Sequence, residues 1–241
     1  MKLSVVIPVY DEEATVAELL AKVASAPLPE PVDDLEMIAV DDCSTDGTWG
    51  EVEAWRAPVR EDGRAVVLLS ERHPRNRGKG AALKTGFGLS TGELLLVQDA
   101  DLEYDPTDYP TLLQPIIDGF ADVVFGSRFL GGPHRVLFFW HYLGNRFLTL
   151  LSNMFTDLNL TDMETCYKAF SRGVLDRITL RSERFGFEPE FTARIARLGV
   201  RIYEVPISYH GRTYAEGKKI GWKDGVSAIW SILRFNLWDR R

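Results

Sequence analysis

The sequence predicts an α/β fold built on a doubly wound, mostly parallel sheet. Short apolar, β-branched runs recur through the first 130 residues, and segments with helical spacing or helix-start residues separate them. Three of these runs end in carboxylates, at residues 11–13, 41–42 and 99–103. Such alternation is typical of parallel strands joined by helical crossovers, whose carboxyl ends line a ligand site.

The expected strands are the apolar runs themselves, bounded by turn residues or carboxylates. They cover residues 3–9, 35–40, 65–69, 94–97 and 122–125, with a further strand at 201–207. Helices are expected over residues 12–24, from the 78–80 segment to about 89, and over 106–119. Asp11 is expected to cap the first helix, and Asp46 or Ser44 the helix after the second strand.

Two apolar stripes predict C-terminal amphipathic helices. Residues 136–155 carry one polar stripe, at His141, Asn145, Thr149 and Ser152/Asn153, and the second apolar stripe is Trp222, Val226, Ile229, Trp230, Leu233 and Leu237. Three interpretations stay open for these segments: burial against the sheet, a position at a membrane interface, or contact between copies of the chain. Arg146 and Gly144 argue against a helix that spans a bilayer.

The composition narrows the class of protein. With 241 residues, of which 45% are hydrophobic and 26% charged, the chain can bury a full core. The net charge of −7 argues against general affinity for nucleic acid. Two cysteines, Cys43 and Cys166, form no metal-ligand spacing or disulfide framework and fit a reducing cytosol. We expect no signal peptide and no transmembrane helix.

The acidic segment after residues 94–97 is the strongest candidate site. Asp99 and Asp101 follow the expected strand one residue apart, and Glu103 adds a third carboxylate. Hard oxygen donors at this spacing suit Mg²⁺ or Mn²⁺ that also contacts substrate phosphates. The alternative interpretation is a solvated acidic turn at the end of a strand.

Other segments offer groups that suit a nucleotide. Asp41 and Asp42 end the second strand, where a carboxylate can accept from a base N–H or from ribose hydroxyls. Gly78 and Gly80 permit close backbone approach to a ligand around the Lys79 cation, although the Walker pattern is absent. The basic, glycine-containing loop at 209–220 can fold over a phosphate-bearing ligand or remain a solvated turn.

Together these motifs resemble a known family. Residues 3–13 (LSVVIPVYDEE), 41–48 (DDCSTDGT), 78–87 (GKGAALKTGF), 99–103 (DADLE) and 126–129 (GSRF) look like family 2 inverting glycosyltransferases of the Rossmann-like GT-A fold. They are most similar to the dolichol- and polyprenyl-phosphate mannose and glucose synthases. The resemblance implies a single domain over residues 1–241, with a nucleotide-sugar half (1–130) and an acceptor half (131–241).

The resemblance also implies roles for individual residues. Asp99, Asp101 and Glu103 would hold the metal, and Arg128 and Arg146 would meet an acceptor phosphate. The nucleotide sugar would be bound by Pro8, Tyr10, Glu12, Asp41, Asp42, Lys79, Asp99, Arg212 and Lys218, and the catalytic set would be Asp101, Arg128, Asp162 and Glu164. The chain departs from relatives at Asp11, where Asn is usual, at Glu103, where Gln is frequent, and at 164–168.

The implied reaction is metal-dependent transfer of glucose or mannose from a UDP- or GDP-sugar to a polyprenyl or dolichyl phosphate, with inversion. Such an enzyme would lie in the cytoplasm or peripherally on the cytoplasmic face of the membrane. Assembly into a homo-oligomer is a further open alternative. A phosphate acceptor needs no strong base, whereas a hydroxyl acceptor would require one, from Asp162, Glu164, Glu188 or Glu190. Alternatives are a family 2 enzyme with a soluble saccharide or protein acceptor, a sugar-nucleotidyltransferase and a non-enzymatic binding module.

Overall fold

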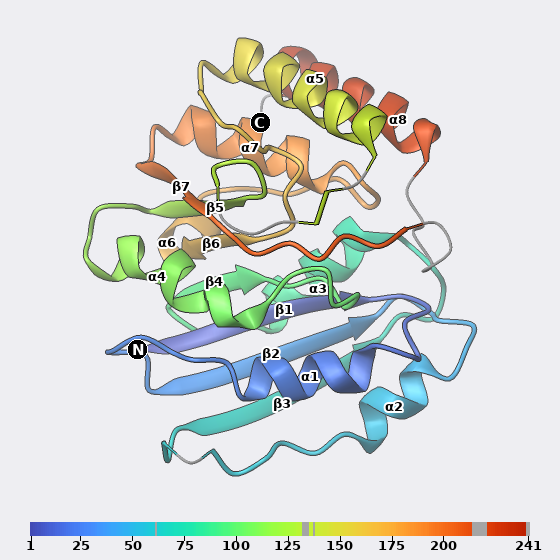
Figure 1. Ribbon diagram of the computed structural model, residues 1–241, viewed down its shortest axis with the longest axis vertical. Coiled ribbons are helices and arrows are strands. Elements are labelled where there is room, and N and C mark those ends of the chain that lie inside the picture. The colour runs from blue at the N-terminus through green and yellow to red at the C-terminus, as the bar shows by residue number, and fades with distance from the viewer. Residues whose placement is uncertain (61, 132–134, 137, 214–220, 240–241) are drawn as a thin grey trace.

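The computed structural model describes residues 1–60, 62–131, 135–136, 138–213 and 221–239. One sheet of seven strands runs through them in the order β3-β2-β1-β4-β6-β5-β7 (Figure 1). The strands are β1 Lys2–Val9, β2 Asp34–Asp41, β3 Ala65–Arg72, β4 Leu94–Val97, β5 Val123–Ser127, β6 Lys168–Ser171 and β7 Ile202–Pro206. All pairings are parallel except those of β6 with β4 and β5, so the predicted fold class is confirmed.

Helices cover both faces of this sheet and one end of the molecule. They are α1 Val16–Ala24, α2 Thr48–Ala54, α3 Lys79–Leu89, α4 Tyr109–Ile117 (after the turn η1 Pro106–Asp108), α5 Phe139–Thr156, α6 Arg172–Leu175, α7 Phe187–Leu198 and α8 Trp222–Leu233, which continues into the π-helical turn η3 Arg234–Trp238. In Figure 1, α5 and α8 lie side by side at the end opposite β3, with α7 between them and the sheet.

Three elements were not among the expected ones: β6, α7 and the four-residue helix α6. β6 has only four residues and begins with Lys168, so no apolar run marks it, although Lys168 is wholly buried and donates to the Met163 and Thr165 carbonyls. α7 is buried over Phe187–Ile195, including Glu188 and Glu190. Because charged and polar residues are among those that α7 buries, no apolar run marks this helix in the sequence.

The start of the first helix also differs from expectation. α1 begins at Val16, because residues 12–15 form a turn before it. Asp11 does not cap α1: its backbone is left-handed (φ 51°), and its carboxylate accepts from the Thr45 amide at 2.7 Å. The residue that caps α2 is Gly47 rather than Asp46, although the Asp46 carboxylate accepts from the Thr48 amide at the first residue of the helix. Ser44 instead donates to Asp41.

The polar stripe of α5 faces the protein and its apolar side faces outward. Thr149 and Ser152 are buried, whereas Trp140 is 76% exposed and Met154 72% exposed. The interpretation of α5 as a helix buried against the sheet is therefore wrong. Among the described residues, no helix combines the length and apolar character needed to cross a membrane.

Gly86 provides a test of how α3 packs on the sheet. A Cβ at Gly86 would overlap the Val6 side chain of β1, whereas a Cβ at the exposed Gly88 meets nothing. We expect Gly86→Ala to lower the free energy of unfolding by about 1–3 kcal/mol through overpacking. Gly88→Ala, in the same helix, should raise it by about 0.5–1 kcal/mol. Urea unfolding of both variants checks this, and equal effects would contradict the packing.

Candidate active site

Carboxylates gather where β1 and β4 end. Asp99, Asp101 and Glu103 follow β4, and Glu12 follows β1; we call these four residues the carboxylate cluster. Burial, together with the charges of Asp99 and Glu103, raises the pKa of Asp101 to about 7, although Arg212 acts in the opposite direction. A group of acids whose charges disfavour one another is a site that attracts cations.

Arg212 lies within the carboxylate cluster. Its Nη2 is 2.9 Å from Asp101 Oδ2, its Nε 3.4 Å from Glu103 Oε1 and its Nη1 3.5 Å from Glu12 Oε2. The Arg212 amide donates to Glu103, and the Tyr209 hydroxyl donates to the other Glu103 oxygen at 2.7 Å. Glu103 therefore anchors residues 209–212 beside the end of β4. Lys218, predicted in the same loop, lies outside the described residues.

Lys79 joins the other side of the cluster to α7. Its ammonium, at the first residue of α3, lies 2.8 Å from Asp99 and 2.9 Å from Glu188. Burial would lower the pKa of Lys79, but Asp99 and Glu188 hold it well above its ordinary value. The amine stays charged and positions both carboxylates. The pairing with Glu188 crosses more than 100 residues and has no local signal in the sequence.

The donor chemistry of the cluster fits a divalent metal ion only in part. As the side chains lie, no three acidic, His or Cys side chains among the described residues are arranged to hold a metal. Both Glu103 oxygens are engaged with Tyr209 and Arg212, so the three-carboxylate arrangement is not assembled. Asp99 and Asp101 remain as hard oxygen donors one residue apart, which is the donor type that Mg²⁺ and Mn²⁺ take.

The predicted nucleotide-binding acids at the end of β2 are buried and engaged within the chain. Asp41 accepts from the Ser44 amide and lies 3.0 Å from Arg72 Nε. Asp42 accepts from the Arg77 amide at 2.9 Å, and its Oδ1 is 2.7 Å from His73 Nδ1. Both carboxylates hold the loops that adjoin the end of β2 through these contacts. Their contact with the base and ribose of a nucleotide stays a prediction.

The predicted residues at the end of β1 and just after it are at least partly exposed at the same edge. The Tyr10 side chain is 39% exposed, and Pro8 and Glu12 are partly buried. The backbone of Gly78 takes φ +98°, and a Cβ there would meet the Glu183 carbonyl. Glycine is therefore required where the β3–α3 loop approaches residues 182–184.

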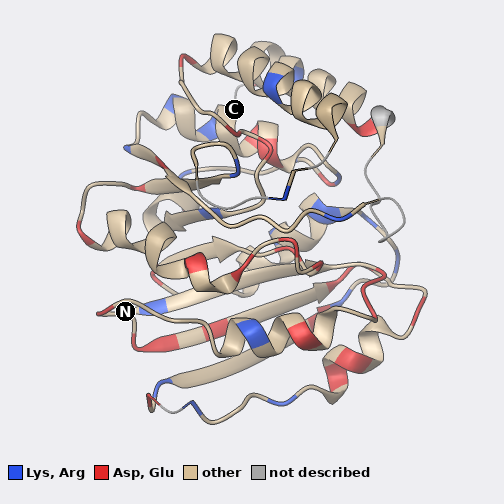
Figure 2. Cartoon of the chain, in the orientation of Figure 1, with Lys and Arg blue, Asp and Glu red and all other residues tan. Residues whose placement is uncertain are grey.

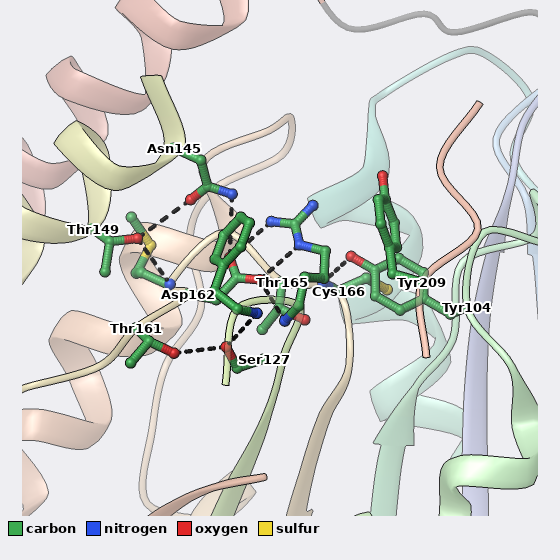
Figure 3. Close-up of polar contacts among 12 residues, drawn as sticks. Tyr104, Ser127, Asn145, Thr149, Thr161, Asp162, Thr165, Cys166 and Tyr209 are labelled. Carbon is green, nitrogen blue, oxygen red and sulfur yellow. Dashed lines mark hydrogen bonds and ion pairs between the residues drawn. The ribbon is translucent and has the colours of Figure 1, made fainter. Parts of the chain in front are cut away.

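Arg128 is held by Asp162 in a second network (Figure 3). Its Nε and Nη2 donate to the two Asp162 oxygens at 2.6 and 2.7 Å, and the guanidinium lies 5.1 Å from the Tyr209 ring centroid. Asn145 of α5 donates to Asp162, while Thr149 accepts from the Met163 amide. Asp162 is fully buried and acts here as the orienting partner of Arg128. Arg146, on the exposed surface of α5, takes no part in the network as described.

The four candidate general bases are now distinguishable. Asp162 pairs with Arg128 and Glu188 with Lys79, while Glu190 accepts from the Arg181 and Ser182 amides and from Arg194. Glu164 differs, because its buried Oε1 has no hydrogen-bond partner among the described residues. Burial, aided by the charge of Glu188, raises the pKa of Glu164 to about 8.

Comparison with known proteins identifies the family. The glycosyl transferase family 2 profile matches residues 4–179, well over half of the chain. The chain belongs to glycosyl transferase family 2. Over 250 aligned residues it is 32% identical to the undecaprenyl-phosphate mannosyltransferase of Micrococcus luteus, covering 98% of this chain and 95% of that protein. The predicted family is therefore confirmed, and the chain is a glycosyltransferase.

One further relative is a longer protein, and one solved structure shares the fold of this glycosyltransferase. The undecaprenyl-phosphate 4-deoxy-4-formamido-L-arabinose transferase of Pseudomonas aeruginosa is 32% identical over 89% of this chain, which spans only 59% of that protein. The glucosyl-3-phosphoglycerate synthase structure from Mycobacterium tuberculosis gives a TM-score of 0.69 at 23% identity, covering 98% of this chain and 80% of that one. This likeness confirms the GT-A fold.

Glu164 gives the glycosyltransferase a predictable pH dependence of stability. Its pKa rises from 4.5 to about 8 on folding, so between these values the folded state binds the extra proton. The free energy of unfolding should therefore fall with rising pH, by up to about 1.4 kcal/mol per unit from this group. Asp101 contributes in the same direction up to about pH 7.

Urea unfolding in EDTA, between about pH 5.5 and about pH 8.5, measures this slope. Glu164→Gln should make this slope less steep by nearly 1.4 kcal/mol per pH unit, which is about the contribution of one proton. Glu53→Gln, on the exposed side of α2, serves as the matched control and should leave the slope unchanged. A Glu164→Gln slope equal to that of the wild type would contradict the assignment.

Proposed function

We propose that this glycosyltransferase transfers a hexose from a nucleotide diphosphate sugar to a polyprenyl phosphate, with inversion at the sugar carbon. The observation that carries the proposal is the relative matched along nearly its whole length, which is named as an undecaprenyl-phosphate mannosyltransferase. The donor is UDP- or GDP-linked glucose or mannose. Family membership removes the sugar-nucleotidyltransferase and the non-enzymatic module from consideration.

Asp99 and Asp101 would hold Mg²⁺ or Mn²⁺, which offsets the charge that develops on the departing nucleotide. The glucosyl-3-phosphoglycerate synthase structure, described with Mn²⁺ and UDP, supports a divalent ion in this fold. Lys79 keeps Asp99 in place from α3, and Tyr10 offers an exposed ring beside the nucleotide. Arg212 then supplies positive charge for the diphosphate.

The protonation of Glu164 supports a phosphate acceptor. With a pKa of about 8, this carboxyl keeps its proton at neutral pH and cannot accept another from an acceptor hydroxyl. A phosphate monoester is already largely ionised near pH 7 and attacks without a base. Arg128, fixed by Asp162, would orient that phosphate. A soluble hydroxyl acceptor remains the rival and would show a rate that rises as Glu164 ionises.

The transfer assay tests the reaction and the metal together. Labelled UDP-glucose and GDP-mannose are supplied with a short polyprenyl phosphate and Mg²⁺ or Mn²⁺. Asp101→Ala should lower kcat/KM at least about 100-fold, because several kcal/mol of charge stabilisation is lost. Asp118→Asn, at the end of α4, serves as the control and should retain activity. A product with retained configuration, or transfer only to soluble saccharides, would refute the proposal.

We further propose that α5 and α8 contact the cytoplasmic face of a lipid bilayer, where a polyprenyl phosphate resides. Trp140, Met154, Trp230 and Trp238 expose 76%, 72%, 57% and 65% of their surfaces. Both helices are mostly free of charged residues in Figure 2. The opposite side of α5 carries Asn145, which holds Asp162 and thereby Arg128. The apolar face thus lies one helix away from the proposed phosphate-binding arginine.

Liposome co-sedimentation tests this surface. Each large apolar side chain buried in lipid contributes about 1.5–3 kcal/mol, so Trp140→Glu with Met154→Glu should weaken binding at least about tenfold. Phe120→Glu is the matched control, because Phe120 is 59% exposed in the turn that follows α4, away from α5 and α8. Unchanged lipid binding, together with loss of a dimer on a sizing column, would instead assign the face to contact between copies.

A further inference from the structure

We propose that Arg212 is the resident counter-ion of the carboxylate cluster and that a divalent cation binds Asp101 only by displacing it. This inference rests on the metal dependence in the proposed function and adds a mechanism of regulation at the same site. It assigns Arg212 two successive partners: the carboxylates when the cation is absent, and the nucleotide diphosphate when the cation is bound.

Arg212 contacts three of the four residues of the carboxylate cluster. Its guanidinium reaches carboxylates from two separate segments, Glu12 after β1 and Asp101 and Glu103 after β4, at 2.9–3.5 Å. Only 19% of the side chain is exposed. The planar fork of guanidinium lets one residue satisfy several carboxylates at once, which a single ammonium group does less well.

Each Asp101 oxygen accepts a hydrogen bond while Arg212 is in place. Its Oδ2 accepts from Arg212 Nη2 at 2.9 Å, and its Oδ1 accepts from the Glu103 amide at 3.2 Å. The Glu103 amide belongs to the turn after β4 and is fixed by the backbone, whereas Arg212 is a side chain with rotatable bonds. A cation that coordinates Asp101 directly therefore has its easier route through Oδ2, where it replaces Arg212.

The exchange needs only the side chain to move. The backbone of residues 209–212 is held separately, by the Tyr209 hydroxyl and the Arg212 amide on Glu103. The displaced guanidinium thus stays tethered next to the cation, where a diphosphate would provide its new partner. Because the nucleotide favours the displaced position, nucleotide and cation should each strengthen binding of the other by the same factor.

Mn²⁺ binding followed by electron paramagnetic resonance tests the exchange without any sugar or lipid. Arg212→Gln removes the guanidinium charge beside Glu12, Asp101 and Glu103, so it should bind Mn²⁺ about tenfold more tightly than the wild type, equivalent to about 1.4 kcal/mol. Arg212→Lys keeps the charge but loses the fork, and should lie between the two. Arg201→Gln, which removes an exposed ion pair with Asp122, is the control and should match the wild type.

UDP supplies the second readout. It should tighten Mn²⁺ binding to the wild type, and clearly less so to Arg212→Gln, while Mn²⁺ should raise the melting temperature of Arg212→Gln more than that of the wild type. Equal or weaker Mn²⁺ binding by Arg212→Gln, or an Arg212→Lys affinity equal to the wild type, would overturn the exchange alone. Failure of the wild type to bind Mn²⁺ even with UDP would instead refute the metal dependence.

Discussion

The structure of the site depends on one electrostatic constraint. The fold concentrates negative charge at one edge of the sheet, and cationic side chains must neutralise it. Parallel strands deliver their carboxyl ends to the same place, so Glu12, Asp99, Asp101 and Glu103 meet whatever their separation in sequence. Carboxylates that are partly buried and close together destabilise one another unless cations join them. Lys79 and Arg212 supply those cations from α3 and from the segment after β7.

The same electrostatic requirement organises the second network, which lies at the end of β5. Arg128, at the end of β5, is neutralised by the buried Asp162, and Asp162 in turn is satisfied by Asn145 of α5. A helix that directs its polar side chains inward must place its apolar side chains outward. The exposed apolar face of α5 is therefore the other side of the polar network that orients Arg128, and the two features arise from one arrangement.

Much of the fold followed from local pattern. Apolar runs of four to seven residues located β1 to β5 and β7 to within a few residues. For β1, β2, β4 and β5 the reason is burial on both faces, which leaves a strand little choice of composition. β6 and α7 escaped prediction for the opposite reason. β6 begins with a buried lysine satisfied by nearby carbonyls. α7 buries Glu188 against the distant Lys79 and Glu190 against Arg194 of the same helix.

By itself, the sequence determined the class of fold, the family and the position of the acids at the ends of strands, because each depends on residues adjacent in the chain. Only the tertiary structure decided which cation each acid meets. Glu103 joins Tyr209 and Arg212, and Glu188 joins Lys79, across more than 100 residues. Several arginines and lysines could serve each carboxylate, and only packing selects among them.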